Sequence, residues 1–183
     1  MKLMIGITTL KNTITSQVVR ELHKLHREHD YELEIESESA PAEYARNIIV
    51  GKFLASACTH LLFIDDDMAP YESAAKILSS TRDITGAIYA MNPADSHAPI
   101  VGTGYALITR RVLEDKRMWL APGPTDIPPV FQVRRSSNGQ VLATEDVDFC
   151  ERAFALGYSI FLDVDAKSGH VKTFDITELV PVL

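Results

Sequence analysis

The feature that most constrains the fold is a short apolar run that ends in three consecutive aspartates. The run, His-Leu-Leu-Phe-Ile at residues 60–64, has the length of a strand and no alternating polar side chains, which is typical of a strand buried on both faces of a sheet. Asp65, Asp66 and Asp67 follow directly. Adjacent carboxylates repel one another, so we expect a cation or hydrogen-bond donors to offset their charge. Because ligands of open α/β sheets bind beyond the carboxyl ends of strands, these aspartates form a candidate binding site.

The rest of the chain predicts alternating strands and helices. We expect strands at residues 3–9, 31–36, 84–90, 100–109 and 159–163, and helices at 15–29, from Pro41 onward, at 71–80 and at 145–156. Asn138-Gly139 predicts a hairpin between residues 130–135 and 140–142. In residues 31–36, apolar side chains alternate with glutamates, which predicts a half-buried strand with a solvated acidic face. The order indicates a three-layer α/β/α domain with a mixed, mostly parallel sheet.

The composition narrows the function classes. A chain of 183 residues with 46% hydrophobic residues suits one domain, residues 1–183, with a sizeable core. Its net charge of −7 argues against a general nucleic-acid binder. Cys58 and Cys150 lie far apart, so we expect neither a disulfide framework nor a zinc ribbon, and a reducing, cytoplasmic location is the simplest interpretation. No apolar run approaches the ~18 residues of a membrane span, and no signal-peptide pattern opens the chain.

Two groups of acids can carry chemistry. On an extended chain Asp65 and Asp67 point in the same direction, so the pair can face one divalent cation and a phosphorylated ligand. Oxygen ligands of this kind suit Mg²⁺ or Mn²⁺. The alternative is an acidic turn that caps the next helix. Glu145 and Asp146 open a predicted helix, where they would complement its dipole; close to the aspartates, one of them can serve as a general base. A lone histidine such as His170 is more often an ordinary surface or core residue.

The motifs occur in an order that resembles a known family. The order is Ala45-Arg46-Asn47, residues 59–68 (THLLFIDDDM), residues 102–110 (GTGYALITR), residues 145–158 (EDVDFCERAFALGY) and Gly169-His170. This chain resembles glycosyltransferases of the A-type fold (GT-A), close to the family 2-like enzymes and their small bacterial and phage relatives, over about residues 3 to 171. The resemblance implies the nucleotide-diphospho-sugar transferase fold. It also implies metal-dependent transfer of a hexose or pentose from a nucleoside-diphosphate sugar to an acceptor hydroxyl.

The resemblance also implies a role for individual residues. Those that bind the nucleotide sugar would be Thr8, Thr9, Arg46, Asn47, Asp65 and Asp66, with Gly102 and Gly104 bordering the sugar and the acceptor. Asp65 would contact the ribose or the base of the sugar nucleotide. Asp65, Asp67 and His170 would be ligands of Mn²⁺ or Mg²⁺, and this ion would bridge the diphosphate. Asp146, or in second place Glu145, would be the base that deprotonates the acceptor.

Other classes compete with this interpretation. A phosphatase of the haloacid dehalogenase type also has Asp-x-Asp after a strand, but on its first strand and with Thr or Val where this chain has Ala69. A receiver domain has an acidic pair where this chain has Thr8 and Thr9. A non-catalytic module that binds a sugar nucleotide or a glycan stays open as the alternative, because a sequence shows no turnover.

The sequence leaves the acceptor open. The 183 residues are about the size of a bare catalytic core, so we expect the acceptor to bind on loops or through a partner or a second copy of the chain in a homo-oligomer. The loop at residues 116–129, with Trp119, is the candidate acceptor surface. A glycan, a lipid-linked sugar, a protein side chain and a modified nucleobase are all candidate acceptors. The donor sugar, its base and the stereochemistry of transfer stay open as well.

Overall fold

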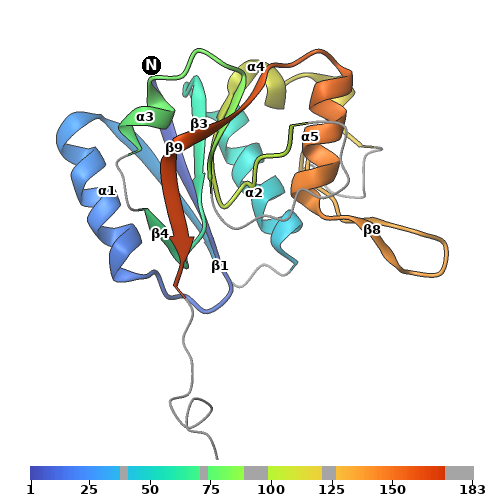
Figure 1. Cartoon of the computed structure of the whole chain (residues 1–183), viewed down its shortest axis with the longest axis horizontal. Coiled ribbons are helices and arrows are strands. Elements are labelled where there is room, and N and C mark those ends of the chain that lie inside the picture. The colour runs from blue at the N-terminus through green and yellow to red at the C-terminus, as the bar shows by residue number, and fades with distance from the viewer. Residues whose placement is uncertain (38–40, 71–73, 89–98, 121–126, 172–183) are drawn as a thin grey trace, which may run out of the picture.

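The computed structural model describes residues 1–37, 41–70, 74–88, 99–120 and 127–171. Within these residues, helices cover both faces of a seven-stranded sheet with the order β2-β1-β3-β6-β5-β9-β4 (Figure 1). The strands are β1 (Leu3–Thr9), β2 (Tyr31–Ser37), β3 (His60–Ile64), β4 (Met68–Pro70), β5 (Ile84–Ile88), β6 (Tyr105–Thr109) and β9 (Ile160–His170). The helices are α1 (Ser16–Glu28), α2 (Ala42–Ala55), α3 (Ala75–Leu78), α4 (Arg110–Leu113) and α5 (Glu145–Ala155), with a 3₁₀ turn at Lys116–Met118. A separate ribbon pairs β7 (Arg134–Arg135) with β8 (Val141–Ala143).

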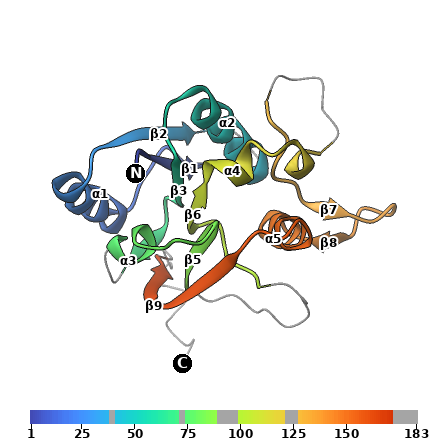
Figure 2. The same cartoon turned by 90° about the horizontal axis from the view of Figure 1, so that it is seen from above.

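Two apolar cores lie on opposite faces of the sheet. Helices α2, α4 and α5 pack on one face, and their buried residues include Ile49, Phe53, Val112, Phe149 and Ala153. Helices α1 and α3 pack on the other, with Val18, Leu25, Ile77 and Leu78. Figure 2 shows the two groups of helices on either side of the sheet. The predicted three-layer α/β architecture is therefore confirmed.

The strand directions place the candidate site at one edge of the sheet. Strand β1 pairs in parallel with both β2 and β3. Strand β6 pairs antiparallel with both β3 and β5, and β9 pairs in parallel with β5. Because β1 and β3 are parallel neighbours, Thr8 and Thr9 at the end of β1 lie beside Asp65, which follows β3. A parallel pair thus brings together residues more than fifty positions apart.

Strand β2 is where the alternation predicts it, but the prediction of its solvated face is wrong. Leu33 and Ile35 are each 42% exposed, whereas Glu34 and Glu36 are partly buried and bind Lys52 Nζ at 3.0 and 3.5 Å. Lys52 belongs to α2, which therefore covers the glutamate face of this edge strand. The alternation is a correct sign of a strand and carries no information on which face a helix will cover.

The C-terminal part of the sheet differs most from expectation. Strand β9 continues beyond the predicted residues 159–163 and pairs antiparallel with β4, which the sequence does not predict; Met68 lies opposite His170. Strand β6 starts at Tyr105, later than the predicted residue 100. Parts of the predicted helix at 71–80 and strand at 84–90 lie outside the described residues. Across the part of the chain that the structure describes, none of the helices combines the length and apolar character needed to cross a membrane.

Candidate active site

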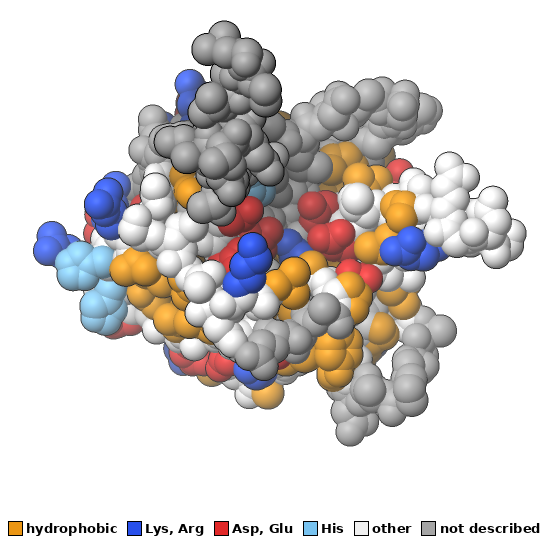
Figure 3. All heavy atoms as spheres, turned by 90° about the horizontal axis from the view of Figure 1, so that it is seen from below, with side chains coloured by type: hydrophobic (Ala, Val, Ile, Leu, Met, Phe, Trp, Pro, Cys, Tyr) orange, Lys and Arg blue, Asp and Glu red, His pale blue; other side chains and the backbone are white. Residues whose placement is uncertain are grey.

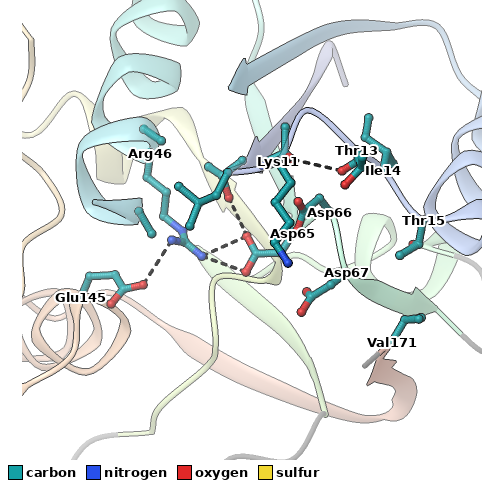
Figure 4. Close-up of a pocket in the computed structure, with 15 residues that line it drawn as sticks. Lys11, Thr13, Ile14, Thr15, Arg46, Asp65, Asp66, Asp67, Glu145 and Val171 are labelled. Carbon is teal, nitrogen blue, oxygen red and sulfur yellow. Dashed lines mark hydrogen bonds and ion pairs between the residues drawn. The ribbon is translucent and has the colours of Figure 1, made fainter. Parts of the chain in front are cut away.

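A cavity of about 730 Å³ lies at the carboxyl ends of β1 and β3 (Figure 4). Seven predicted site residues line it: Thr8, Thr9, Arg46, Asp65, Asp66, Asp67 and Glu145. The lining also includes Ala45 of the Ala45-Arg46-Asn47 motif, and residues with no role predicted from the sequence: Leu10, Lys11, Thr13, Ile14, Thr15, Ala42 and Val171. Figure 3 shows acidic side chains gathered near the centre of one face of the molecule, with basic side chains beside them. The structure therefore brings most of the predicted set together.

The aspartates form a turn rather than an extended segment. The Met68 N–H donates to Asp65 O at 3.1 Å, which closes the turn, and the Asp65 N–H donates to Gly104 O at 2.8 Å. The prediction of an extended Asp-Asp-Asp segment is therefore wrong, because the chain reverses directly after β3 to start β4. We call residues 65–67 the aspartate turn. All of its side chains line the cavity.

Arg46 of α2 connects the aspartate turn to α5. Its Nη2 donates to both carboxylate oxygens of Asp65 at 3.0 Å, and its Nη1 donates to Glu145 Oε1 at 3.2 Å. Thr8 Oγ1 adds a hydrogen bond to Asp65 Oδ1 at 2.9 Å. The Arg46 side chain is only 4% exposed, so these charge-assisted bonds lie largely away from water. The donors that adjacent carboxylates require thus come from α2 and β1.

His170 lies next to the aspartate turn because β9 pairs with β4. His170 Nδ1 lies 3.3 Å from Asp67 Oδ1, and the Val171 N–H donates to Asp67 O at 2.7 Å. Both side chains are partly exposed, at 31% for His170 and 48% for Asp67. The carboxylate of Asp67 is the kind of ligand that Mn²⁺ and Mg²⁺ prefer, and the imidazole of His170 is a ligand of divalent transition metals.

The predicted set of three metal ligands does not assemble. Both carboxylate oxygens of Asp65 accept hydrogen bonds from Arg46. Among the described residues, no group of three or more His, Cys, Asp or Glu side chains is placed to hold a metal ion. Asp67 and His170 therefore fit a divalent cation only if it takes its other ligands from a bound molecule or water, as Mg²⁺ commonly does.

The acid pair at the start of α5, Glu145 and Asp146, has two environments. Asp146 Oδ1 accepts hydrogen bonds from Thr103 N, at 3.2 Å, and from Thr103 Oγ1. Burial raises the pKa of Asp146 above its ordinary value, against the opposing effects of Arg46 and Thr103. Burial, together with the charge of Asp146, also raises the pKa of Glu145. A carboxylate with a raised pKa is a better proton acceptor near neutral pH, so both groups suit a general base.

Comparison with known proteins identifies solved structures with the same fold, but no relative by sequence. No family model matches the chain, and no curated protein matches it. Among solved structures, it is similar to A197 from STIV, with a TM-score of 0.64 and 17% identity over 94% of this chain and 87% of that chain. It is also similar to a glycosyltransferase involved in the glycosylation of the major capsid of PBCV-1, with a TM-score of 0.54 and 16% identity over 97% and 96% of the two chains. This chain has the glycosyltransferase A-type fold.

A third structure with this fold contains a nucleotide. S. aureus TarS 1–349 in complex with UDP matches with a TM-score of 0.53 and 14% identity. The match covers 94% of this chain but only 61% of the TarS chain, so TarS has a large part without a counterpart here. The fold predicted from the motifs is confirmed. The sequence of this chain, however, differs greatly from the sequences of these proteins.

Within the A-type fold, Asn47 lies away from the cavity, contrary to expectation. It is buried, donates to Phe131 O at 2.9 Å, and accepts from the N–H groups of Val130 and Phe131 at 2.9 and 2.8 Å. All of these bonds fix the segment at residues 130–131 to α2. Asn47 follows Arg46 on the helix, and one residue of helical rotation turns its side chain from the cavity to the core side.

The two predicted glycines lie outside the cavity lining, and one of them accepts a backbone hydrogen bond from the aspartate turn. Gly102 and Gly104 are buried and outside the cavity lining. Between them, Thr103 donates to Asp146, and Gly104 O accepts from the Asp65 N–H. Residues 102–104 thus connect the aspartate turn with the acid pair.

Asp148 of α5 binds an arginine of the ribbon formed by β7 and β8. Asp148 is buried and binds Arg152 Nε at 2.8 Å and Arg134 Nη1 at 3.3 Å. Trp119, in the loop expected to form the acceptor surface, is partly buried, and its Nε1 donates to Leu113 O at 2.9 Å. Lys116 Nζ lies 3.0 Å from its ring centroid. Residues 121–126 of this loop lie outside the described residues, so the acceptor surface stays a prediction.

Proposed function

We propose that this protein is a glycosyltransferase that moves a sugar from a nucleoside-diphosphate sugar to an acceptor hydroxyl, with residues 1–183 forming one catalytic domain. The observation that carries this proposal is the cavity in which Arg46 joins the aspartate turn to Glu145, in a chain with the A-type fold. One structure with this fold is described as a glycosyltransferase, and another holds UDP. Both support a nucleoside diphosphate as the ligand of this cavity.

The donor would bind along the aspartate turn. When the sugar leaves the nucleoside diphosphate, negative charge grows on the phosphate oxygens. Asp67 and His170 would hold Mn²⁺ or Mg²⁺, which when bound offsets that charge. Asp65, whose position is set by Arg46 and Thr8, would accept hydrogen bonds from the nucleoside.

Asp146 would take the proton from the acceptor hydroxyl while the oxygen of that hydroxyl attacks the anomeric carbon of the donor sugar. Thr103 holds Oδ1, and no described residue donates a hydrogen bond to Oδ2, so Oδ2 is the oxygen available for the proton. Glu145 is the second choice, because its Oε1 is bound to Arg46, and a guanidinium partner makes a carboxylate a weaker base.

Turnover tests this proposal. UDP-, GDP-, CDP- and dTDP-sugars are incubated with the protein and Mn²⁺, and release of the nucleoside diphosphate is measured. We expect release from at least one donor, loss of release in Asp146→Asn and Asp67→Ala, and no change in Asp30→Asn, where the aspartate is exposed and does not line the cavity. A non-catalytic module would bind a donor without releasing the diphosphate under any of these conditions.

A further inference from the structure

The loop between β1 and α1 is attached to the aspartate turn. At the end of the loop, the Thr15 N–H donates to Asp66 O at 2.9 Å and Thr15 Oγ1 donates to Met68 O at 3.1 Å. At its start, Thr9 Oγ1 donates to Thr13 O at 3.0 Å. These bonds give residues 9–15 a defined path along the cavity.

The conformation of this loop directs Lys11 to the cavity. The Lys11 N–H donates to Thr9 Oγ1 at 3.4 Å, and Asn12 has a φ of 52°, a left-handed conformation that Asn adopts more readily than most residues. Lys11 lines the cavity together with the aspartate turn. Figure 4 shows its side chain extending beside Asp65 and Asp66.

Two cationic side chains line the described part of the cavity, and they differ in what they bind. Arg46 is 4% exposed and is bound to Asp65 and Glu145. Lys11 is exposed and forms no ion pair with any residue that the structure describes. Of the two, Lys11 is therefore the one whose charge is available to an anionic ligand.

We propose that Lys11 binds a phosphate oxygen of the nucleoside diphosphate and supplies a part of the affinity that needs no divalent cation. The inference rests on the proposed function. The carboxylates of Asp66 and Asp67 repel a diphosphate, so a cation is required beside them. A metal ion between Asp67, His170 and the ligand is one such cation, and the Lys11 ammonium is a second, which donates charge-assisted hydrogen bonds to phosphate.

Calorimetric titration with UDP and with uridine, in EDTA and in Mn²⁺, separates the two cations. In EDTA, we expect the wild-type protein to bind UDP more tightly than uridine. Lys11→Met loses that difference, a weakening of roughly tenfold, because a hydrogen bond to a charged group is removed. Lys11→Arg keeps most of it, and Lys24→Met, which changes an exposed lysine of α1, leaves it unchanged.

The metal-dependent part serves as the opposite control. Lys11→Met still gains UDP affinity when Mn²⁺ is added, whereas Asp67→Asn loses that gain. Circular dichroism and thermal melting confirm that each variant is folded.

Two results would overturn the inference and leave the proposed function standing: equal UDP affinity of the wild type and Lys11→Met in EDTA, or UDP binding by the wild type only in Mn²⁺. Failure of the wild type to bind UDP, GDP, CDP or dTDP in either condition would overturn the proposed function itself.

Discussion

The aspartate turn after β3 and the acid pair at the start of α5 are built in different ways. Asp65 accepts from a guanidinium and a hydroxyl, so its negative charge is matched by a positive one. Asp146 accepts from the backbone and hydroxyl of Thr103, and burial raises its pKa. In the aspartate turn a guanidinium binds the carboxylate of Asp65, whereas burial makes Asp146 suited to take up a proton. Surroundings rather than residue type therefore suggest the division of roles.

Replacement of Asp146 or Asp65 by asparagine is the strongest test of this difference between the two clusters. We expect Asp146→Asn to slow transfer by about 10²–10⁴-fold, the usual contribution of general base catalysis, with nearly unchanged UDP affinity. Asp65→Asn should instead weaken UDP binding, because it disturbs the partner of Arg46. Initial rates of diphosphate release and calorimetry separate the two effects. Equal losses of UDP affinity in both variants would contradict the proposed division.

Arg46 is expected to matter for stability more than any other residue of the site, because it binds both clusters. Arg46→Met leaves Asp65 and Glu145 without their cation, and we expect a loss of about 3 kcal/mol in the free energy of unfolding. Arg20→Met, which changes an exposed arginine of α1, should cost less than about 0.5 kcal/mol. Urea denaturation at pH 7 measures both. A stability of Arg46→Met equal to that of Arg20→Met would show that the clusters are not connected through Arg46.

The pH dependence of stability sharpens the comparison, because the sign follows from the direction of each pKa shift. The pKa of Asp146 is raised by burial, so the folded state binds its proton more tightly than the unfolded state. Its favourable contribution exists below the unfolded value of 3.8 and is lost as the pH rises through the folded pKa. Asp146→Asn should therefore gain stability relative to the wild type as the pH rises above 3.8.

Asp83 is the matched control with the opposite sign. A hydrogen-bonded Arg111 lowers the pKa of Asp83 from 3.8 to about 2, so its contribution exists above 3.8 and is lost as the pH falls through about 2. Asp83→Asn should be less stable than the wild type at neutral pH and approach it in acid. Urea denaturation as a function of pH measures both variants, and the same pH trend in Asp146→Asn and Asp83→Asn would contradict the assigned environments.

A smaller effect is expected at His170. His170→Ala should reduce the gain in UDP affinity on adding Mn²⁺ and leave binding in EDTA unchanged. His23→Ala, at an exposed position of α1, is the control. Titration of UDP at several Mn²⁺ concentrations gives the measurement. Identical Mn²⁺ responses in the two variants would remove His170 from the metal site.

The sequence predicted the central strands well because their signals are local. Residues 60–64 form β3 with the predicted bounds, because a continuous apolar run of this length that ends in aspartates is too short for a helix and fits a buried strand. Strand β4 has three residues and includes Pro70, so it has no periodicity, and its pairing with β9 depends on residues a hundred positions away. That pairing places His170 beside Asp67, which no local pattern shows.

The candidate site was predictable in residue identity more than in arrangement. The motifs singled out Arg46 and Asp65, but their ion pair depends on how α2 packs on the sheet. Asn47, which follows Arg46, faces the core, and Lys11 was missed because a lone lysine after a strand has no pattern. Its signal lies in the hydrogen bonds of Thr9 and Thr15, which only the folded chain displays.

The central claim is that the cavity beside the aspartate turn binds a nucleoside-diphosphate sugar. Thermal unfolding of the wild type with UDP-, GDP-, CDP- and dTDP-sugars, each with and without Mn²⁺, tests it most directly. We predict a higher melting temperature with at least one of these donors, increased further by Mn²⁺ and reduced in Asp65→Asn. No change in melting temperature with any donor under either condition would contradict the claim.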